Sequence, residues 1–284
     1  MAGNIGSPNP IQPLSVGNVV SAGLRLYRSH LKDYFLLALK AYLWVLIPVY
    51  GWAKFYALTA LISRLAFGEL VNQPESIPSG QRFVNSRLWQ FLLTILLLFL
   101  VGIGIGIGVV IVFSLLGILS AGLLGGSGQQ RNPAIYLLFA LVAFVIGIGV
   151  FVGVLWLVTR FYLVDLPLAV EDNMDASTAI GRSWELTQGH VWRVLLISFV
   201  AFLITLPIQI VVQILTRVLQ FVFLPLIQDG SSIYLLLYLV LVLVISFSSG
   251  AVLVPFWQTI KAVIYYDLRS RREGLGLKLR DREV

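Results

Sequence analysis

Four long apolar runs most strongly limit what this chain can fold into. They cover residues Leu88 to Leu124, Ala134 to Thr159, Val194 to Ile227 and Ile233 to Ile260. Each run exceeds the roughly 20 residues that a helix needs to cross a hydrocarbon core about 30 Å thick. With 58% apolar and only 12% charged residues, the chain has too little polar surface to cover a soluble domain of 284 residues. The sequence therefore predicts an all-α, polytopic membrane protein.

An earlier apolar stretch, Tyr34 to Ser63, is interrupted in its middle by IPVYGW. Pro48 lacks the amide proton that a continuous helix uses, and Gly51 permits a reversal of the backbone. We therefore expect a membrane hairpin of two helices of roughly 15 residues each, which is short for a full crossing or re-entrant. Five aromatic residues are expected near its tip, at the membrane interface: Tyr42, Trp44, Tyr50, Trp52 and Tyr56. With this hairpin, the membrane helices number about six.

Positive charge gathers in four segments outside the long runs. These segments hold 16 of the 20 Lys and Arg residues: Arg25, Arg28, Lys32, Arg64, Arg82, Arg87, Arg160, Arg182, Arg193, Lys261, Arg269, Arg271, Arg272, Lys278, Arg280 and Arg282. The remaining loops, GGSGQQRN and QDGSS, carry a single cation, Arg131. Because cytoplasmic loops are enriched in Lys and Arg, this distribution predicts that both termini are cytoplasmic.

The two ends of the chain differ from the membrane part in composition. Residues 1–14 are rich in Gly, Pro, Asn and Ser and show no basic segment followed by an apolar core, so we expect a disordered tail and no cleavable signal peptide. Residues 274–284 form a basic cytoplasmic tail, which leaves a single membrane domain, 15–273. The chain has no cysteine, which excludes disulfides and thiolate metal sites.

A short acidic pattern recurs three times along the chain. It comprises Glu69-Leu70 with Glu75, Asp165-Leu166 with Glu171, and Asp267-Leu268 with Glu273, at intervals of 96 and 102 residues. A basic residue precedes each copy: Arg64, Arg160 and Lys261. Each copy follows a predicted hairpin, which is itself preceded by an amphipathic segment with a helix-capping serine at Ser15, Ser79 or Ser177. We therefore divide the domain into three repeat units, 15–75, 76–171 and 172–273, each a cytoplasmic amphipathic helix followed by a membrane hairpin.

The acids of this pattern lie where helices are expected to leave the lipid. We expect Glu69, Asp165 and Asp267 to occupy equivalent places, close to three arginines of the amphipathic helices: Arg28, Arg87 and Arg182. A carboxylate that shares its charge with an arginine near water avoids the cost of an isolated ion in a dry interior. We predict a structural clip that fastens each hairpin to the cytoplasmic helices. Glu171 and Glu273 would serve the helical layer itself, Glu75 belongs to the same set, and a binding role for the acids is the alternative.

The segment VEDNMDASTAIGRSWELTQGHVWRVLLI, with an Ala-x-x-Arg-Ser-Trp core at Ala179 to Trp184, resembles a signature of bacterial polytopic proteins. These proteins are related to the membrane domain attached to some glycerophosphodiester phosphodiesterases. YYDLRSRREGLGL, residues 265 to 277, is similar to the C-terminal signature of the same group. The resemblance implies a six-helix membrane domain of undefined activity in a bacterial inner membrane or another internal bacterial membrane. The phosphodiesterase of such fusions is a separate soluble barrel, so no catalytic activity is implied for this chain.

Glycines recur in two of the long runs. VGIGIGIGVV contains two overlapping GxxxG spacings, Gly102 with Gly106 and Gly104 with Gly108, and the next run contains Gly149 and Gly153. A phosphate-binding loop would need a preceding strand, whereas this segment lies within a predicted membrane helix. We expect a close helix-packing surface, with a hinge or a notch for a lipid or pigment as the alternative.

A polar stripe is predicted in the third long run. Its members, Gln209, Gln213, Arg217 and Gln220, are three or four residues apart and share one helix face. Polar residues inside a bilayer point to a pathway or a binding site. Counting about 20 residues from Arg193 at the inner surface instead places the stripe near the outer interface, where Arg217 extends into the headgroups.

No recognisable catalytic motif is present. GGSG at 125–128 matches the short motif of intramembrane serine proteases, but both histidines, His30 and His190, are expected on the other side of the membrane. HExxH and P-loop motifs are absent, so neither a metal nor a cofactor is predicted.

The sequence favours a non-enzymatic integral membrane protein that organises lipids or partner proteins through a basic cytoplasmic face. Anionic lipids or another membrane protein are the expected partners, and the oligomeric state is not defined. Nucleic acid is not expected despite the net charge of +7, because the cations flank apolar runs. The alternative is a transporter or permease whose small anionic substrate meets Arg217. Against coupled transport, no carboxylate lies within the long runs away from their ends.

Overall fold

The computed structural model describes residues 14–124, 133–228 and 232–274. This part of the chain is all helical and contains no strand. The helices are α1 (Val16–Ser29), α2 (Leu31–Val45), α3 (Tyr50–Leu70), α4 (Ile77–Ser86), α5 (Leu88–Leu124), α6 (Pro133–Arg160), α7 (Asp165–Val170), α8 (Ala176–Thr187), α9 (Val191–Gln228) and α10 (Ser232–Glu273). Four of them, α5, α6, α9 and α10, are long and apolar enough to cross a membrane, so the chain is a multi-pass membrane protein. The GGSG motif and residues 1–13 and 275–284 lie outside the described part.

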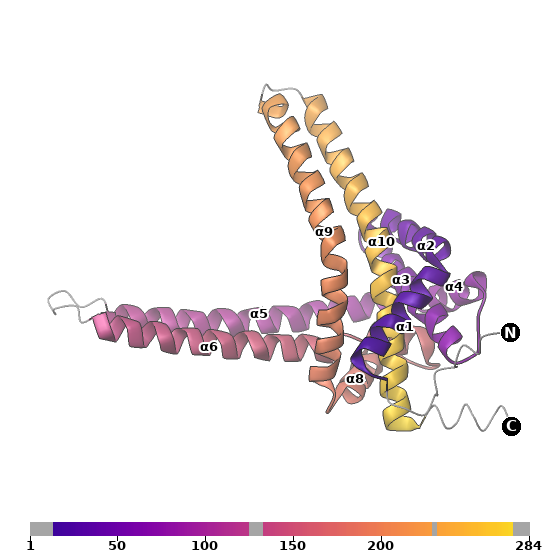
Figure 1. Ribbon diagram of the computed structural model, residues 1–284, viewed down its shortest axis with the longest axis horizontal. Helices are drawn as coiled ribbons and strands as arrows, with labels where there is room; N and C mark the ends of the chain where they lie inside the picture. Colours follow the sequence, from indigo (N-terminus) through magenta and orange to yellow (C-terminus); the bar gives the residue numbers. More distant parts are fainter. Residues whose placement is uncertain (1–13, 125–132, 229–231, 275–284) are drawn as a thin grey trace, which may run out of the picture.

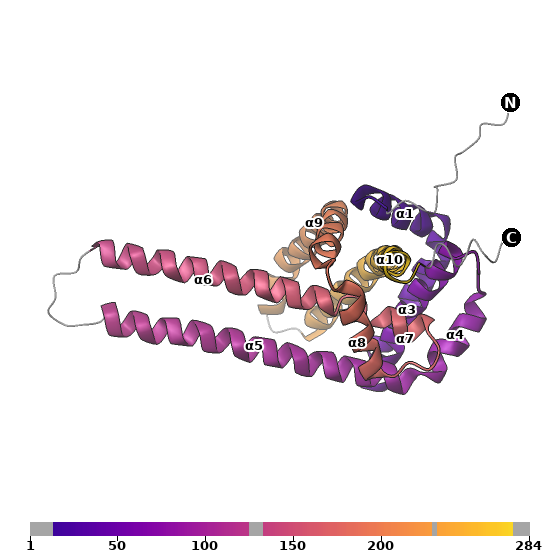
Figure 2. The ribbon, with the colours of Figure 1, turned by 90° about the horizontal axis from the view of Figure 1, so that it is seen from below.

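Two helical hairpins, called arms below, project from a base of packed helices. The first arm consists of α5 and α6, the second of α9 and α10, and the two leave the base in different directions (Figures 1 and 2). Most side chains of the arms are exposed, as Leu100, Ile118 and Leu137 illustrate at 62 to 69%. A continuous apolar surface of this size is unfavourable in water, so the arms require lipid around them.

The base is built around α3 and the C-terminal part of α10. Phe67 of α3 and Tyr265 of α10 pack edge to face, with ring centroids 5.4 Å apart. The hydroxyl of Ser63 donates to the carbonyl oxygen of Gln258 at 3.1 Å, so the two helices are also joined by a buried hydrogen bond. α1 packs against α10 at Gly23, where an added Cβ would lie 2.5 Å from Cδ1 of Ile260.

The four predicted apolar runs coincide with the four long helices. α5 begins and ends at the predicted residues, whereas α10 continues beyond the predicted end at Ile260 as far as Glu273. This extension contains two ion pairs, Asp267 with Arg271 and Arg269 with Glu273. In each pair the partners are one helical turn apart, and the N–O distance is 3.0 Å. Pairs at this spacing stabilise a helix after it has left the apolar run.

The predicted reversal at IPVYGW is found between α2 and α3, but a different residue makes it. The left-handed conformation belongs to Val49, with φ of 61°, and Gly51 already lies in the first turn of α3. Gly51 is needed for space, because an added Cβ would lie 1.9 Å from the carbonyl oxygen of Trp44. Of the predicted tip aromatics, Tyr50 and Trp52 are exposed, whereas Tyr56 packs against Phe91 of α5.

The predicted starts of the three short helices are correct for one and shifted for two. Ser15 caps α1 by accepting a hydrogen bond from the backbone N–H of Asn18. The cap of α4 is Ser76 and not Ser79, because Pro78 is tolerated in the first turn of a helix. The cap of α8 is Asp175 and not Ser177. The backbone N–H of Thr178 donates to the Asp175 carboxylate at 2.8 Å and holds the pKa of that group below its ordinary value.

Candidate functional site

The buried carboxylate of Asp165 fastens α7 to α10. Asp165 is the first residue of α7 and is fully buried, and Nζ of Lys261 in α10 lies 2.9 Å from its Oδ2. The side chain of Lys261 is only 16% exposed, so water screens the pair weakly. The second carboxylate oxygen, Oδ1, has no hydrogen-bond partner within the described ranges. The charge of Asp165 is therefore balanced by Lys261.

Asp267 joins three segments that are distant in the sequence. Its Oδ2 lies 3.0 Å from the guanidinium of Arg193 in α9 and 3.0 Å from that of Arg271 in α10. The same guanidinium of Arg193 donates to the backbone carbonyl of Leu14, just before α1. The buried carboxylate thus joins the start of α9 to the end of α10, and Arg193 extends this connection to the residue before the cap of α1.

Arg182 of α8 bridges two of the predicted acids. Its Nε lies 3.2 Å from Glu171, and its Nη2 contacts Glu273 at the end of α10. Arg269 completes the cluster 3.0 Å from Glu273, and the hydroxyl of Tyr265 donates to Glu171. Burial disfavours the charged guanidinium of Arg182, but the two carboxylates outweigh it and raise the pKa of Arg182. The cluster connects α8 and α10 through alternating charges.

The first acidic pair, Glu69 and Glu75, lies around the end of α3. Burial raises the pKa of Glu69, and His30, with Nε2 3.1 Å from that carboxylate, partly offsets the shift. Burial also acts on Glu75, but hydrogen bonds from Arg64 at 2.6 Å and Ser79 at 2.7 Å outweigh it and lower the pKa of Glu75. Arg64 donates in addition to the carbonyl oxygen of Ala169, so it connects α3 to α7.

The three arginines expected beside the acids have different environments. Arg182 contacts two of the acids, as described above. Arg87 donates to backbone carbonyls, at 2.6 Å to Glu171 and 3.2 Å to Leu168. Arg28 is exposed, and no carboxylate in the described segments pairs with it. The stabilising role of the predicted clip stays a prediction, but the structure shows which cations it would use.

The three acids expected to be equivalent, Glu69, Asp165 and Asp267, occupy different positions in their helices. Glu69 lies in the last turn of α3, Asp165 begins the new helix α7, and Asp267 lies inside the continuous helix α10. Their partners accordingly differ: a histidine, a lysine and two arginines.

Sequence reasoning missed most of the cations that bind these acids. Arg193, Arg269 and Arg271 were noted only as positive charge. One signal was available, because Arg64 and Lys261 are the basic residues that precede copies of the acidic pattern, and each binds an acid. The corresponding Arg160 instead lies between the rings of Trp156 and Trp184, 4.7 and 4.6 Å from their centroids, and donates to the carbonyl oxygen of Trp184.

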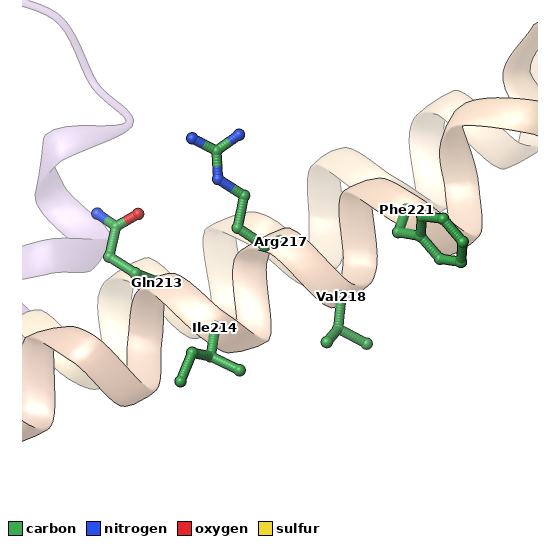
Figure 3. Close-up of a pocket in the computed structure, with 5 residues that line it drawn as sticks. All are labelled: Gln213, Ile214, Arg217, Val218 and Phe221. Atoms are coloured by element: carbon green, nitrogen blue, oxygen red, sulfur yellow. The ribbon is translucent and has the colours of Figure 1, made fainter.

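The polar stripe lies on a mostly exposed face of α9. Gln213 and Arg217 point in the same direction from the helix, away from Ile214 and Val218 (Figure 3). These four residues and Phe221 line a shallow hollow of about 370 Å³, and all five come from α9 itself. Arg217 is exposed and donates to Gln220 at 3.1 Å, and Gln209 donates to Thr205. The hollow therefore has no opposing wall.

The structure does not bring the predicted glycines of α5 and α6 into close contact. No atom lies within 4 Å of a Cβ added at any of them: Gly102, Gly104, Gly106, Gly108, Gly149 and Gly153. Gly108 and Gly153 line a shallow groove between the two helices with Ile105, Val109 and Val154. Packing through these glycines stays a prediction that this arrangement of the arm does not display.

Three exposed cations without a carboxylate partner among the described residues lie close together in the sequence, at a place that we call the basic corner. It comprises Arg25 and Arg28 of α1 and Lys32 at the start of α2, all exposed, beside the exposed Asp33. Around α8 the exposed charges are mainly acidic, contributed by Asp172, Asp175 and Glu185. The expected basic face is therefore smaller than the sequence indicates, because seven of the sixteen cations are half-buried or buried within the base: Arg64, Arg87, Arg160, Arg182, Arg193, Lys261 and Arg269.

No group of three His, Asp or Glu side chains within residues 14–124, 133–228 and 232–274 could hold a metal ion. Comparison with protein-family models, curated proteins and solved structures finds no match to this chain. The relation to phosphodiesterase-linked membrane domains stays a prediction from the sequence motifs.

Proposed function

We propose that this protein is a non-enzymatic integral membrane protein that organises anionic lipids, or a partner membrane protein, through its basic corner. One observation carries the proposal: five of the six acids of the repeated pattern pair with Lys or Arg side chains of the base, whereas the cations of the basic corner are exposed and have no carboxylate partner among the described residues. Exposed Lys and Arg beside a membrane attract anionic headgroups.

The amphipathic character of α1 supports this role. Val19, Val20 and Tyr27 are buried on the side that packs against α9 and α10, and Arg25 and Arg28 lie on the exposed side. An amphipathic helix with this distribution places its cations where headgroup phosphates can reach them.

We also propose that the chain consists of three units, 15–75, 76–171 and 172–273, with six membrane helices. The order of elements supports it, since a short helix precedes a two-helix hairpin in α1 with α2–α3, in α4 with α5–α6, and in α8 with α9–α10. The resemblance of the sequence motifs to bacterial membrane proteins supports a bacterial internal membrane, and the charge distribution supports a cytoplasmic location of both termini.

The transporter alternative receives less support from the geometry. Its candidate site is the polar stripe, and the hollow beside Arg217 is lined by α9 alone. A transported substrate needs a site that partner helices can enclose from both sides. The proposal therefore favours lipid organisation.

The proposal is tested by removing the basic corner. A variant with Arg25→Gln, Arg28→Gln and Lys32→Gln is compared with wild type in nanodiscs of mixed phosphatidylcholine and phosphatidylglycerol, and the phosphatidylglycerol retained on release is counted by native mass spectrometry. Each of the three cations contributes about 1 kcal/mol to the binding of anionic lipid, and Asp33 offsets one of them. In the variant, the binding free energy for phosphatidylglycerol should therefore weaken by about 2 kcal/mol at low salt, which is a roughly 30-fold loss of affinity.

The matched control removes three exposed cations elsewhere: Lys40→Gln, Arg82→Gln and Arg217→Gln. The control should retain the lipid as wild type does. Equal retention by the basic-corner variant and wild type would overturn the proposal, and so would an equal loss in the control.

A further inference from the structure

The long helices exceed the thickness of a bilayer. The apolar span Leu88–Gly122 has 35 residues and, at about 1.5 Å per residue, a length of about 52 Å. A helix of that length fits a hydrocarbon core of about 30 Å only when it tilts by about 55° from the membrane normal. The apolar run Ile233 to Ile260 of α10 is about 42 Å long and requires a tilt of about 45°. Transmembrane helices tilt by about 20° on average.

The first arm has no polar side with which to lie on a membrane surface. In the described part of α5 and α6, no charged residue occurs before Arg160. Exposed apolar residues surround the helices, with none of the most apolar window buried by other parts of the protein. A helix that lies in the headgroup region needs a polar face, so this arm belongs inside the hydrocarbon core.

Both arms begin at the base and diverge from it. Trp89 and Trp192, in the first turns of α5 and α9, are 68 and 62% exposed, as expected of indoles at the interface. From these bases, α5–α6 and α9–α10 extend in clearly different directions (Figures 1 and 2). Because the first arm is apolar on all sides, it cannot lie in the headgroup region and has to cross the hydrocarbon core although it diverges from the second arm.

We infer that the two arms lie in a flat bilayer as a V, steeply tilted in opposite directions from a base at one membrane surface, with lipid acyl chains filling the space between them. Excess length and divergence then have the same cause, since each arm tilts until its apolar length matches the hydrocarbon thickness. The angle of the V consequently follows the thickness of the bilayer. A thicker membrane raises both arms and narrows the V, and a thinner one widens it.

The protein contains no native cysteine, so two spin labels can be placed without further changes. Val110→Cys on α5 and Ile210→Cys on α9 lie at exposed mid-arm positions. Their separation is measured by double electron–electron resonance in phosphatidylcholine nanodiscs with monounsaturated chains of 14, 18 or 22 carbons. From the arm lengths, the separation should shorten on the order of 8 Å between the thinnest and thickest bilayers.

A label pair within the base, Asn18→Cys with Arg82→Cys, serves as the control and should keep the same distance in all three bilayers. A mid-arm distance that does not change with chain length would overturn the inference. Because phosphatidylcholine has no net charge, this test does not depend on the basic corner. Loss of anionic-lipid binding would leave it intact, and a constant mid-arm distance would leave the proposed function intact.

Discussion

Replacing Asp165 by Asn should destabilise the base more than any exposed substitution. Asp165→Asn removes the counter-charge of Lys261, whose side chain is 16% exposed and whose Nζ lies 2.9 Å from the lost carboxylate oxygen. Breaking a buried pair by removing one partner costs about 3 kcal/mol or more, because the other charge stays buried. For a chain of this size, that corresponds to a fall in the melting temperature on the order of 10 °C.

The pair itself is measured by a double-mutant cycle. Lys261→Met should cost a similar amount by leaving Asp165 uncompensated. The double variant should cost clearly less than the sum of the two, with a coupling free energy of about 3 kcal/mol. Unfolding in mixed micelles with sodium dodecyl sulfate, followed by the fluorescence of the seven tryptophans, gives each free energy.

Asp33→Asn, at an exposed acid of α2, is the charge-matched control and should stay within about 0.5 kcal/mol of wild type. Strictly additive losses at Asp165 and Lys261 would refute the assignment of this pair as a clip between α7 and α10. Full stability of Asp165→Asn would refute it as well, and would leave a binding role for the carboxylate.

Two further predictions concern Glu75 and Gly23. The pKa of Glu75 is lowered from 4.5 in the folded state, so its pairing with Arg64 stabilises the base above pH 4.5. This stabilisation is lost as the pH falls through the lower folded pKa. In urea denaturation between pH 3 and 7, the free energy of unfolding should therefore depend less on pH for Glu75→Gln than for wild type. Gly23→Ala brings a Cβ to 2.5 Å from Ile260 and should lower the free energy of unfolding by about 1 to 3 kcal/mol in thermal or denaturant melts. The control Gly17→Ala, whose added Cβ has no atom within 4 Å, should be neutral or stabilising. A larger loss of stability for Gly17→Ala than for Gly23→Ala would contradict the close approach of α1 to α10.

The long helices could be predicted because lipid imposes one requirement on many consecutive residues. Any run of 20 or more apolar residues must form its backbone hydrogen bonds internally, so the limits of α5 were readable to the residue. The end of α10 was not, since the helix continues past Ile260 through polar residues that ion pairs and packing against the base hold helical. A hydropathy pattern identifies the part of a helix that contacts lipid, but it does not show whether the helix continues beyond the lipid.

The cations that pair with the acidic residues of the base were harder to predict. The position of Asp165 at a membrane boundary indicated that it needs a cation, but Lys261 is 96 residues away, and no local spacing connects the two. Only pairs within one helix, such as Arg269 with Glu273, follow from sequence separation alone. The direction in which each arm leaves the base likewise has no periodic signal in the sequence of the arm.

Each of the two arms is connected to the base through one continuous helix. α10 runs as one helix from the base to the far end of its arm, and the ring of Tyr42 packs on Gly250, beyond Pro255, so the proline lies within a supported stretch. α5 likewise runs as one helix from the base into its arm, with Phe91 buried against Tyr56 of α3, whereas α6 ends at Arg160 and is followed by the short connection 161–164. Each arm is thus continuous with the base through one helix, α5 or α10, while its other helix, α6 or α9, is joined to the base by a short connection. Because Arg87 and Arg160, at the base of the first arm, bind backbone carbonyls, movement of that arm need not separate a buried ion pair.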